Sequence, residues 1–258
     1  MEEIIVRRVK HLIQDLALSD LVGVLVYGSY VGGRTNSLSD LDVLIITHNY
    51  ETQDSGSLMI DGIRVEYFIQ DLRKLYELIE KEIRNNDPSH LTKFATCEIL
   101  YDVEGKTRAL VNHAKKLYET EIIPVFDDYT RYSIVSINNR IEDLESLINQ
   151  ESFYAVYYYI LEKIRNLYGK INGIIDLPIM KIERIYTDEA FAKKYIASEV
   201  HHLPGQEFIT LYLQCLPVRD KNDMLANIKL LYEYSFGHLD FDAKEFHLRF
   251  SENSPFKV

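Results

Sequence analysis

Apolar residues follow two different spacings in the first half of the chain. Over residues 2–17 they recur every three or four positions, which predicts an amphipathic helix. This helical stripe consists of Ile5, Val9, Leu12, Ile13 and Leu16. Two shorter runs, 21–29 and 41–47, are continuous in apolar and β-branched residues. Their length and composition predict buried strands.

A hairpin follows these two strands. In segment 57–70, Asp61 and Gly62 separate two apolar runs, and this dipeptide is typical of a tight turn between antiparallel strands. Asp71 comes directly after the hairpin and is placed to cap a helix, which Pro88 then ends.

The character of the chain changes near its middle. Residues 97–102 predict a further strand, and Gly105 precedes another helix. After Pro124 the strand signals almost disappear and amphipathic helical stretches take over. The predicted helices cover residues 127–149, 152–171, 179–197, 205–216 and 219–235. We therefore expect an α+β protein, with a mixed sheet and flanking helices in residues 1–122 and a helical bundle in residues 123–258.

Composition excludes several classes of protein. The 258 residues are 47% hydrophobic and 27% charged, as in globular proteins that bury a core. Cys97 and Cys215 are far apart and do not have metal-ligand spacing, so a disulfide framework and structural zinc are not expected. The start of the chain lacks the features of a signal peptide, and no apolar run approaches the ~20 residues of a membrane span. We expect a cytoplasmic protein that has no membrane partner.

Net charge narrows the choice of partner. Lys and Arg total 29 against 40 for Asp and Glu, a formal net charge of -11. Proteins that bind the phosphate backbone of nucleic acids usually carry a basic excess, so a nucleic-acid partner is disfavoured. An acidic balance suits a cationic small substrate, although it also serves solubility alone.

Two aspartates stand at the start of the second predicted strand. Asp40 and Asp42 are two residues apart, so strand alternation puts them on the same face, with Cα atoms roughly 6.5 Å apart. Leu41, Val43 and Ile45 then point to the opposite face and into a core. Two adjacent carboxylates need a compensating cation, and Mg²⁺ prefers carboxylate and phosphate oxygens.

A third acid belongs to the hairpin. In segment 63–69, Glu66 shares a face with Arg64 and Phe68 and interrupts an otherwise apolar strand. If this strand lies beside residues 41–47, Glu66 joins the two aspartates. Three carboxylates could then hold two Mg²⁺ ions with a nucleoside triphosphate. The other interpretation is an exposed strand acid that pairs with a neighbouring cation.

Glycine and serine end the first predicted strand. Gly28 allows the backbone to turn and to approach a phosphate closely, and Ser29 offers a hydroxyl and an amide at what we expect to be a helix start. Neither a Walker loop nor a dinucleotide-binding glycine motif is present around these residues.

Together these residues resemble the signature of the DNA polymerase β-like nucleotidyltransferase superfamily. The residues that carry the resemblance are Gly28-Ser29, Gly33 and Ser39-Asp40-Leu41-Asp42, with Glu66 as the third acid. The resemblance implies that Asp40, Asp42 and Glu66 bind two Mg²⁺ ions. It also implies that Gly28, Ser29 and Ser39 contact the nucleotide, with ATP as the substrate.

The chain length and the helical second half are most similar to the antibiotic nucleotidyltransferases, which include streptomycin/spectinomycin adenylyltransferases and lincosamide enzymes. Segment 162–186 resembles the region of those enzymes that contacts the triphosphate. By this resemblance, Arg165 and Lys181 become candidate phosphate contacts; a solvated helix charge is the alternative.

The function that these observations favour is transfer of AMP from ATP to a hydroxyl of a small acceptor, of the aminoglycoside-like, cationic type. One alternative is a non-catalytic or antitoxin-type binding protein with the same fold; retention of all three acids favours the enzyme. A second alternative is modification of a protein or a tRNA, and the acidic charge argues against tRNA. The oligomeric state stays open, with a homodimer among the options.

Overall fold

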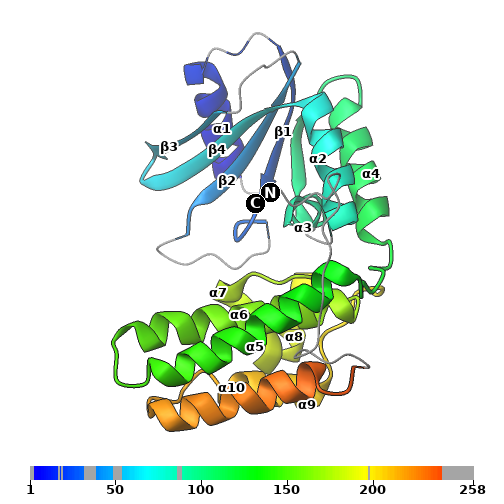
Figure 1. Cartoon of the computed structure of the whole chain (residues 1–258). Coiled ribbons are helices and arrows are strands. Elements are labelled where there is room, and N and C mark those ends of the chain that lie inside the picture. The colour runs from blue at the N-terminus through cyan, green and yellow to red at the C-terminus, as the bar shows by residue number, and fades with distance from the viewer. Residues whose placement is uncertain are drawn as a thin grey trace, which may run out of the picture. The chain divides into compact units, whose positions relative to one another are not determined.

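The computed structural model describes most of the chain (Figure 1). The described residues are 3–16, 18, 20–31, 39–48, 54–85, 89–196 and 198–239. They divide into two compact units, which are described separately below. The first unit comprises residues 1–120 together with the short segment 196–200, and the second comprises residues 121–195 and 201–258.

A five-stranded sheet forms the centre of the first unit, in the order β3-β4-β2-β1-β5. The strands are β1 (Leu21–Tyr27), β2 (Leu41–Thr47), β3 (Asp54–Ile60), β4 (Ile63–Asp71) and β5 (Glu98–Asp102). β2 and β4 are parallel, whereas the β1–β2, β1–β5 and β3–β4 pairs are antiparallel. The sheet is therefore mixed, as the α+β expectation requires.

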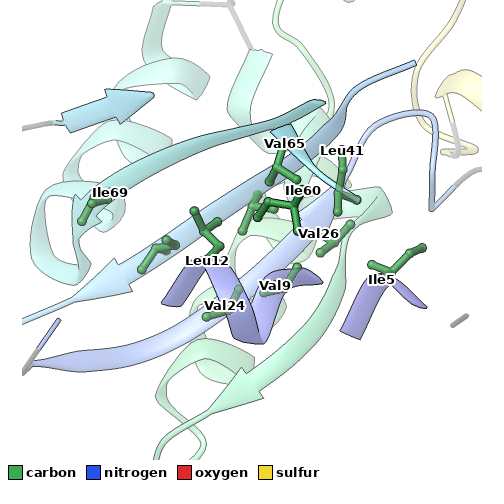
Figure 2. Close-up of a cluster of buried hydrophobic side chains, with 11 residues drawn as sticks. Ile5, Val9, Leu12, Val24, Val26, Leu41, Ile60, Val65 and Ile69 are labelled. Carbon is green, nitrogen blue, oxygen red and sulfur yellow. The ribbon is translucent and has the colours of Figure 1, made fainter. Parts of the chain in front are cut away.

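One face of this sheet packs against α1 (Glu3–Leu16). Ile5, Val9 and Leu12 of the helical stripe lie in one cluster with apolar side chains from the central strands (Figure 2). The strand residues of the cluster are Val24, Val26, Leu41, Val43, Ile45, Ile60, Val65 and Ile69. Alternation along each strand sends these side chains to one face and leaves the residues between them on the other.

The β3–β4 hairpin turns at the predicted dipeptide. Asp61 and Gly62 have φ values of 49° and 76°, the left-handed conformations that a two-residue turn of this kind requires. The carboxylate of Asp61 accepts a hydrogen bond of 2.8 Å from Arg7 Nη2, and its backbone carbonyl accepts one of 3.2 Å from Arg8. The turn is thereby fastened to α1.

Three helices cover the other face of the sheet: α2 (Leu72–Asn85), α3 (Ser89–Thr96) and α4 (Lys106–Tyr118). Asp71 caps α2 as predicted, because its Oδ1 accepts hydrogen bonds of 2.9 and 3.2 Å from the amides of Arg73 and Lys74. α4 lies so close to β1 that a Cβ on Gly23 would stand 1.7 Å from Thr107 Oγ1. Glycine is therefore needed inside this strand.

α3 was not predicted from the sequence. It begins directly after Pro88, and Leu91 and Phe94 are its buried residues. Its amino-terminal amides are capped from the preceding helix, since the Glu82 carboxylate accepts hydrogen bonds from the amides of His90 and Leu91. Proline often stands at the first position of a helix as well as after the last one. Pro88 was predicted only to end the helix that follows Asp71, so the helix after it was missed.

The second unit is helical throughout its described residues. It contains α5 (Asp128–Ser146), α6 (Ser152–Ile171), α7 (Ile179–Thr187), α8 (Glu189–Ile196), α9 (Gln206–Gln214) and α10 (Lys221–Phe236). Aromatic residues of α6 form much of its core, as expected for the tyrosine-rich stretch. Tyr168 stacks on Phe208 with ring centroids 3.9 Å apart, and the buried Tyr157 hydroxyl donates to the Cys215 carbonyl at 2.9 Å.

Segment 196–200 returns to the first unit although it follows most of the second in the chain. The buried Tyr118 hydroxyl donates a hydrogen bond of 2.6 Å to the backbone carbonyl of Ile196. Ser198 Oγ donates another, of 3.1 Å, to the Glu119 carboxylate. The α+β fold class is confirmed, with the mixed sheet in the amino-terminal part and helices in the carboxy-terminal part. Within the described residues, no helix is long and apolar enough to cross a membrane.

Candidate active site

Asp42 and Glu66 are direct neighbours across two strands. Asp42 is the second residue of β2 and is paired with Glu66 in the parallel register of β2 and β4. Both side chains are partly buried and lie on the face opposite the α1 cluster. Asp40 stands immediately before β2, two residues from Asp42, and is also partly buried. The strand adjacency on which the three-acid cluster depends is therefore present.

The pKa of the Tyr27 hydroxyl depends on all three of these acids. Tyr27 is the last residue of β1, is paired with Asp42 across the β1–β2 ladder and is only 7% exposed. Burial raises the pKa of its hydroxyl, and the carboxylates of Asp42, Glu66 and Asp40 raise it further, in that order. The negative potential of all three carboxylates therefore converges on one end of this sheet face.

Gly28 makes room for one of the acids. Its φ is +78°, and a Cβ at this position would stand 2.1 Å from Asp42 Oδ2. The side chain of Asp42 therefore rests directly against the backbone where β1 ends, and only glycine permits this approach. The expected role of Gly28 toward phosphate stays a prediction, and the structure adds a role in positioning Asp42.

The remaining signature residues flank the same end of the sheet. Ser29 is partly buried in the turn over residues 28–31 that follows β1. Ser39 is partly buried directly before Asp40 and makes a polar contact of its own. Gly33 lies outside the described residues. The predicted helix start after Ser29 cannot be followed beyond residue 31 for the same reason.

The chemistry of the acids suits Mg²⁺. Carboxylate oxygens are the hard ligands that this ion prefers, and it is usually bound through one or two carboxylates with substrate phosphates and water. Across the described ranges, no group of three or more His, Cys, Asp and Glu side chains could hold a metal ion by itself. One or two of these acids would therefore leave room for phosphate oxygens and water to complete the coordination.

Arg165 and Lys181, the candidate phosphate contacts, belong to the second unit. Arg165 is only 6% exposed, and its guanidinium forms salt bridges with Glu162 at 2.5 Å and with Asp176 at 3.1 Å. Lys181 lies on α7 with its Nζ 4.9 Å from the centre of the Tyr195 ring. Two carboxylates already occupy the guanidinium of Arg165, so that its phosphate role, like that of Lys181, stays a prediction.

A cavity opens on the acid-bearing face of the sheet, between the central strands and α3. Its volume, with the open mouth included, is about 440 Å³. The lining residues are Leu25, Tyr27, Leu44, Phe68, Gln70, His90, Lys93, Phe94 and Cys97. This cavity was not predictable from the elements expected above, because four of its lining residues lie on α3 or directly after it. The amphipathic spacing of Leu91 and Phe94 after Pro88 was the signal that could have revealed the helix.

The comparison with known families identifies the class of protein. The family model described as nucleotidyltransferase domain matches residues 6–158. The match covers more than half of the chain, so the protein belongs to the nucleotidyltransferase domain family. This confirms the wider resemblance inferred from residues 28–42 and supports nucleotide transfer as the general activity.

Several solved structures match this chain. One of them is a nucleotidyltransferase-like protein from Exiguobacterium sibiricum, 12% identical in sequence, with a TM-score of 0.46. The similarity covers 89% of the present chain and 74% of that one. No curated protein matches this chain.

Proposed function

We propose that this protein transfers AMP from ATP to a hydroxyl group of a small acceptor molecule, with Mg²⁺ held by Asp40 and Asp42 and with Glu66 beside them as the proton acceptor. The observation that carries the proposal is the direct pairing of Asp42 with Glu66 on one sheet face, at the end where Gly28 and Ser29 follow β1. Membership of the nucleotidyltransferase domain family supports the reaction class.

The reaction forms a bond between the acceptor oxygen and the α-phosphorus of ATP and breaks the bond to the bridging oxygen, which leaves with pyrophosphate. Glu66 accepts the proton of the attacking hydroxyl. Asp40 and Asp42 would hold the metal, and Gly28, Ser29 and Ser39 would contact the nucleotide. Mg²⁺ supplies neutralisation of the charge that develops on the phosphate oxygens.

The acceptor that we propose is a cationic small molecule, of which an aminoglycoside-like antibiotic is the clearest case. Two features support this choice. The formal net charge of -11 favours accumulation of cations near the protein, and the helical second half is similar in kind to that of antibiotic nucleotidyltransferases. Antibiotic resistance is the biological role that such an acceptor would give the protein.

The test is direct transfer by the full chain. The protein is incubated with α-labelled ATP, Mg²⁺ and a panel of aminoglycosides and lincosamides, and both pyrophosphate and labelled adducts are measured. We expect Mg²⁺-dependent pyrophosphate release that requires one class of acceptor. Release without an adduct would contradict transfer to these acceptors, and release that persists in EDTA would contradict the metal role.

The alternative of a non-catalytic nucleotide-binding protein makes a different prediction. Such a protein would bind ATP but release no pyrophosphate with any acceptor, including peptides. Titration calorimetry of ATP with Mg²⁺ and with EDTA, together with the transfer assay, separates the two functions. Retention of Asp40, Asp42 and Glu66 favours the enzyme, because a protein that only binds nucleotide does not need all three acids.

A further inference from the structure

The cavity between the sheet and α3 begins beside the acids and extends away from them along the strands. Tyr27, which lines it, is paired with Asp42. Phe68, which also lines it, is two residues from Glu66 on the same face of β4, a separation of roughly 7 Å. The cavity and the candidate active site therefore share one continuous surface.

Apolar side chains form the walls in the middle of this cavity. Leu25 and Leu44 come from the paired strands β1 and β2, and Phe68 and Phe94 come from β4 and α3. Leu25, Leu44 and Phe94 are buried. Walls of this kind fit a flat apolar group, and aromatic rings stack on nucleobases of any type.

A polar side chain stands at the end of the cavity that is far from the acids. Gln70 is only 8% exposed and lies two residues beyond Phe68 on the same face. The backbone carbonyl of Gln70 accepts a hydrogen bond from the hydroxyl of Thr47, and the Gln70 side chain takes no part in it. The Gln70 carboxamide makes no side-chain hydrogen bond within the described ranges, and it is not among the polar groups that are sealed from solvent without a partner, so it borders the open space of the cavity. A ligand in the cavity would therefore meet a donor and an acceptor at this end.

A cation stands at the opposite end. The Nζ atom of Lys93 lies 5.5 Å from the ring centre of Tyr27 and 6.0 Å from that of Phe68. These two rings are next to the acids, so the ammonium group lies where the cavity meets the candidate active site. Lys93 forms no salt bridge with any residue in the part of the chain that the structure describes. An anionic group of a ligand would therefore find a cation at this end.

From this arrangement we infer that the cavity under α3 holds the adenine base of the donor nucleotide, with Gln70 pairing with the base edge and Lys93 contacting a phosphate group. A glutamine carboxamide offers a donor and an acceptor side by side, which matches the N6 and N7 positions of adenine. Glu66 and Gln70 are four residues apart on one face of β4, roughly 13 Å. This length is comparable with that of an extended nucleoside monophosphate.

This inference rests on the proposed nucleotidyl transfer but is tested separately, by binding. Calorimetry with the full chain uses two partial ligands, adenosine in EDTA and inorganic triphosphate with Mg²⁺. Gln70→Leu should weaken adenosine roughly 10-fold, as expected for two lost hydrogen bonds, and leave triphosphate unchanged. Lys93→Met should weaken triphosphate by about 10-fold and leave adenosine unchanged. Both variants should weaken ATP.

Two further variants guard against simple unfolding. Leu44→Phe fills the cavity and should abolish adenosine binding while triphosphate still binds. Lys116→Met removes an exposed lysine from α4 in the same unit and should change neither ligand. Thermal unfolding of each variant establishes that it is folded before its binding is interpreted.

The outcomes separate the two proposals. Adenosine affinity that is unaffected by both Gln70→Leu and Leu44→Phe would overturn the base pocket, even if the wild-type protein transfers AMP. That result would favour the acceptor molecule, and not the base of ATP, as the ligand of the cavity. Adenosine binding that depends on Gln70, without transfer to any acceptor, would support the pocket and contradict the proposed enzymatic function.

Discussion

Asp42 and Glu66 are direct neighbours in the parallel pairing of β2 with β4. The backbone of Gly28, at the end of β1, lies against the side chain of Asp42. The three elements that meet here are separated by loops and by a hairpin in the sequence. Their convergence makes the electrostatics of the site sensitive to single substitutions, and the predictions below use this sensitivity.

Asp42→Asn should abolish transfer, with a loss of kcat/KM on the order of 10³-fold, as found when charge stabilisation is removed from a transition state. The fold should be unchanged or slightly more stable, because one of several adjacent negative charges is gone. Steady-state kinetics and urea unfolding check both parts. Glu77→Gln, which removes an exposed acid from α2, is the control and should behave like the wild type.

Glu66→Gln distinguishes a base from a metal ligand. If Glu66 accepts the proton, kcat falls roughly 10²–10⁴-fold while the KM for ATP is nearly unchanged. If its main role is to bind the metal, the Mg²⁺ dependence shifts as well, and higher Mg²⁺ or Mn²⁺ restores part of the activity. We expect the first pattern. Wild-type turnover would show that Glu66 is only a strand acid on a solvated face.

Gly28→Ala should impair activity beyond its effect on stability. Alanine in the left-handed conformation costs about 1–2 kcal/mol, and the new methyl group would also displace Asp42. Gly105→Ala is a matched control, because its φ of +74° imposes the same backbone cost while no atom lies within 4 Å. Both variants should lose similar stability in urea, and only Gly28→Ala should lose transfer. Equal activity in both would remove the positioning role of Gly28.

Glu82→Gln should loosen α3. Burial alone would raise the pKa of Glu82, but the hydrogen bonds from His90 and Leu91 and the charge of His90 outweigh it, so the pKa is lowered. The stability that ionised Glu82 contributes is therefore present above its unfolded pKa near 4.5 and is lost as pH falls through the folded value. At neutral pH the substitution should cost about 1–3 kcal/mol.

Amide hydrogen exchange at Leu91 together with urea unfolding at pH 7 and pH 4 measures this effect. The difference between the wild type and Glu82→Gln should shrink at the lower pH. A difference that stays constant with pH would mean that the loss comes from packing and not from the ionised carboxylate.

Alkaline pH should destabilise the protein through its buried tyrosines. Burial is the largest cause that raises the pKa of Tyr212 from 10.0 to about 12. Between these values the unfolded chain loses a proton that the folded chain keeps, so stability falls as pH rises, by about 1.4 kcal/mol per pH unit for each such tyrosine. Tyr212→Phe should reduce the slope of unfolding free energy against pH between 10 and 11 by about one proton. An unchanged slope would contradict the assignment.

Several elements were predictable because their patterns are local. The continuous apolar run of β2 and the three- and four-residue spacing in α1 match the observed strand and helix, since six of the seven residues of β2 are buried and α1 buries one face. The tight turn at Asp61 and Gly62 was also predictable, because it depends on the local conformational preference of this dipeptide. Which strand lies beside β2 was not predictable, because strand order depends on packing between distant segments. From the sequence, the pairing of Asp42 with Glu66 could be predicted only on the condition that their two strands are adjacent in the sheet.

The cavity was missed for a related reason. α3 is eight residues long and has few core positions, so its periodicity is weak. The amides at its start are capped by Glu82 of the preceding helix, and no local sequence motif predicts this contact. Gln70 has no distinguishing sequence pattern, because its position on the wall of the cavity follows only from the packing of α3 against the sheet.

The return of segment 196–200 to the first unit has a consequence for how this protein can be inherited and rearranged. A gene fragment that ends near residue 122 would encode every strand of the sheet but not Ile196, whose carbonyl accepts the hydroxyl of Tyr118. Tyr118 would then lose this hydrogen bond. Exchange of helical halves between related genes would succeed only when the donor half also carries a segment that completes the recipient's first unit. The stretch through residue 200 is therefore the shortest amino-terminal fragment that contains every segment of the first unit.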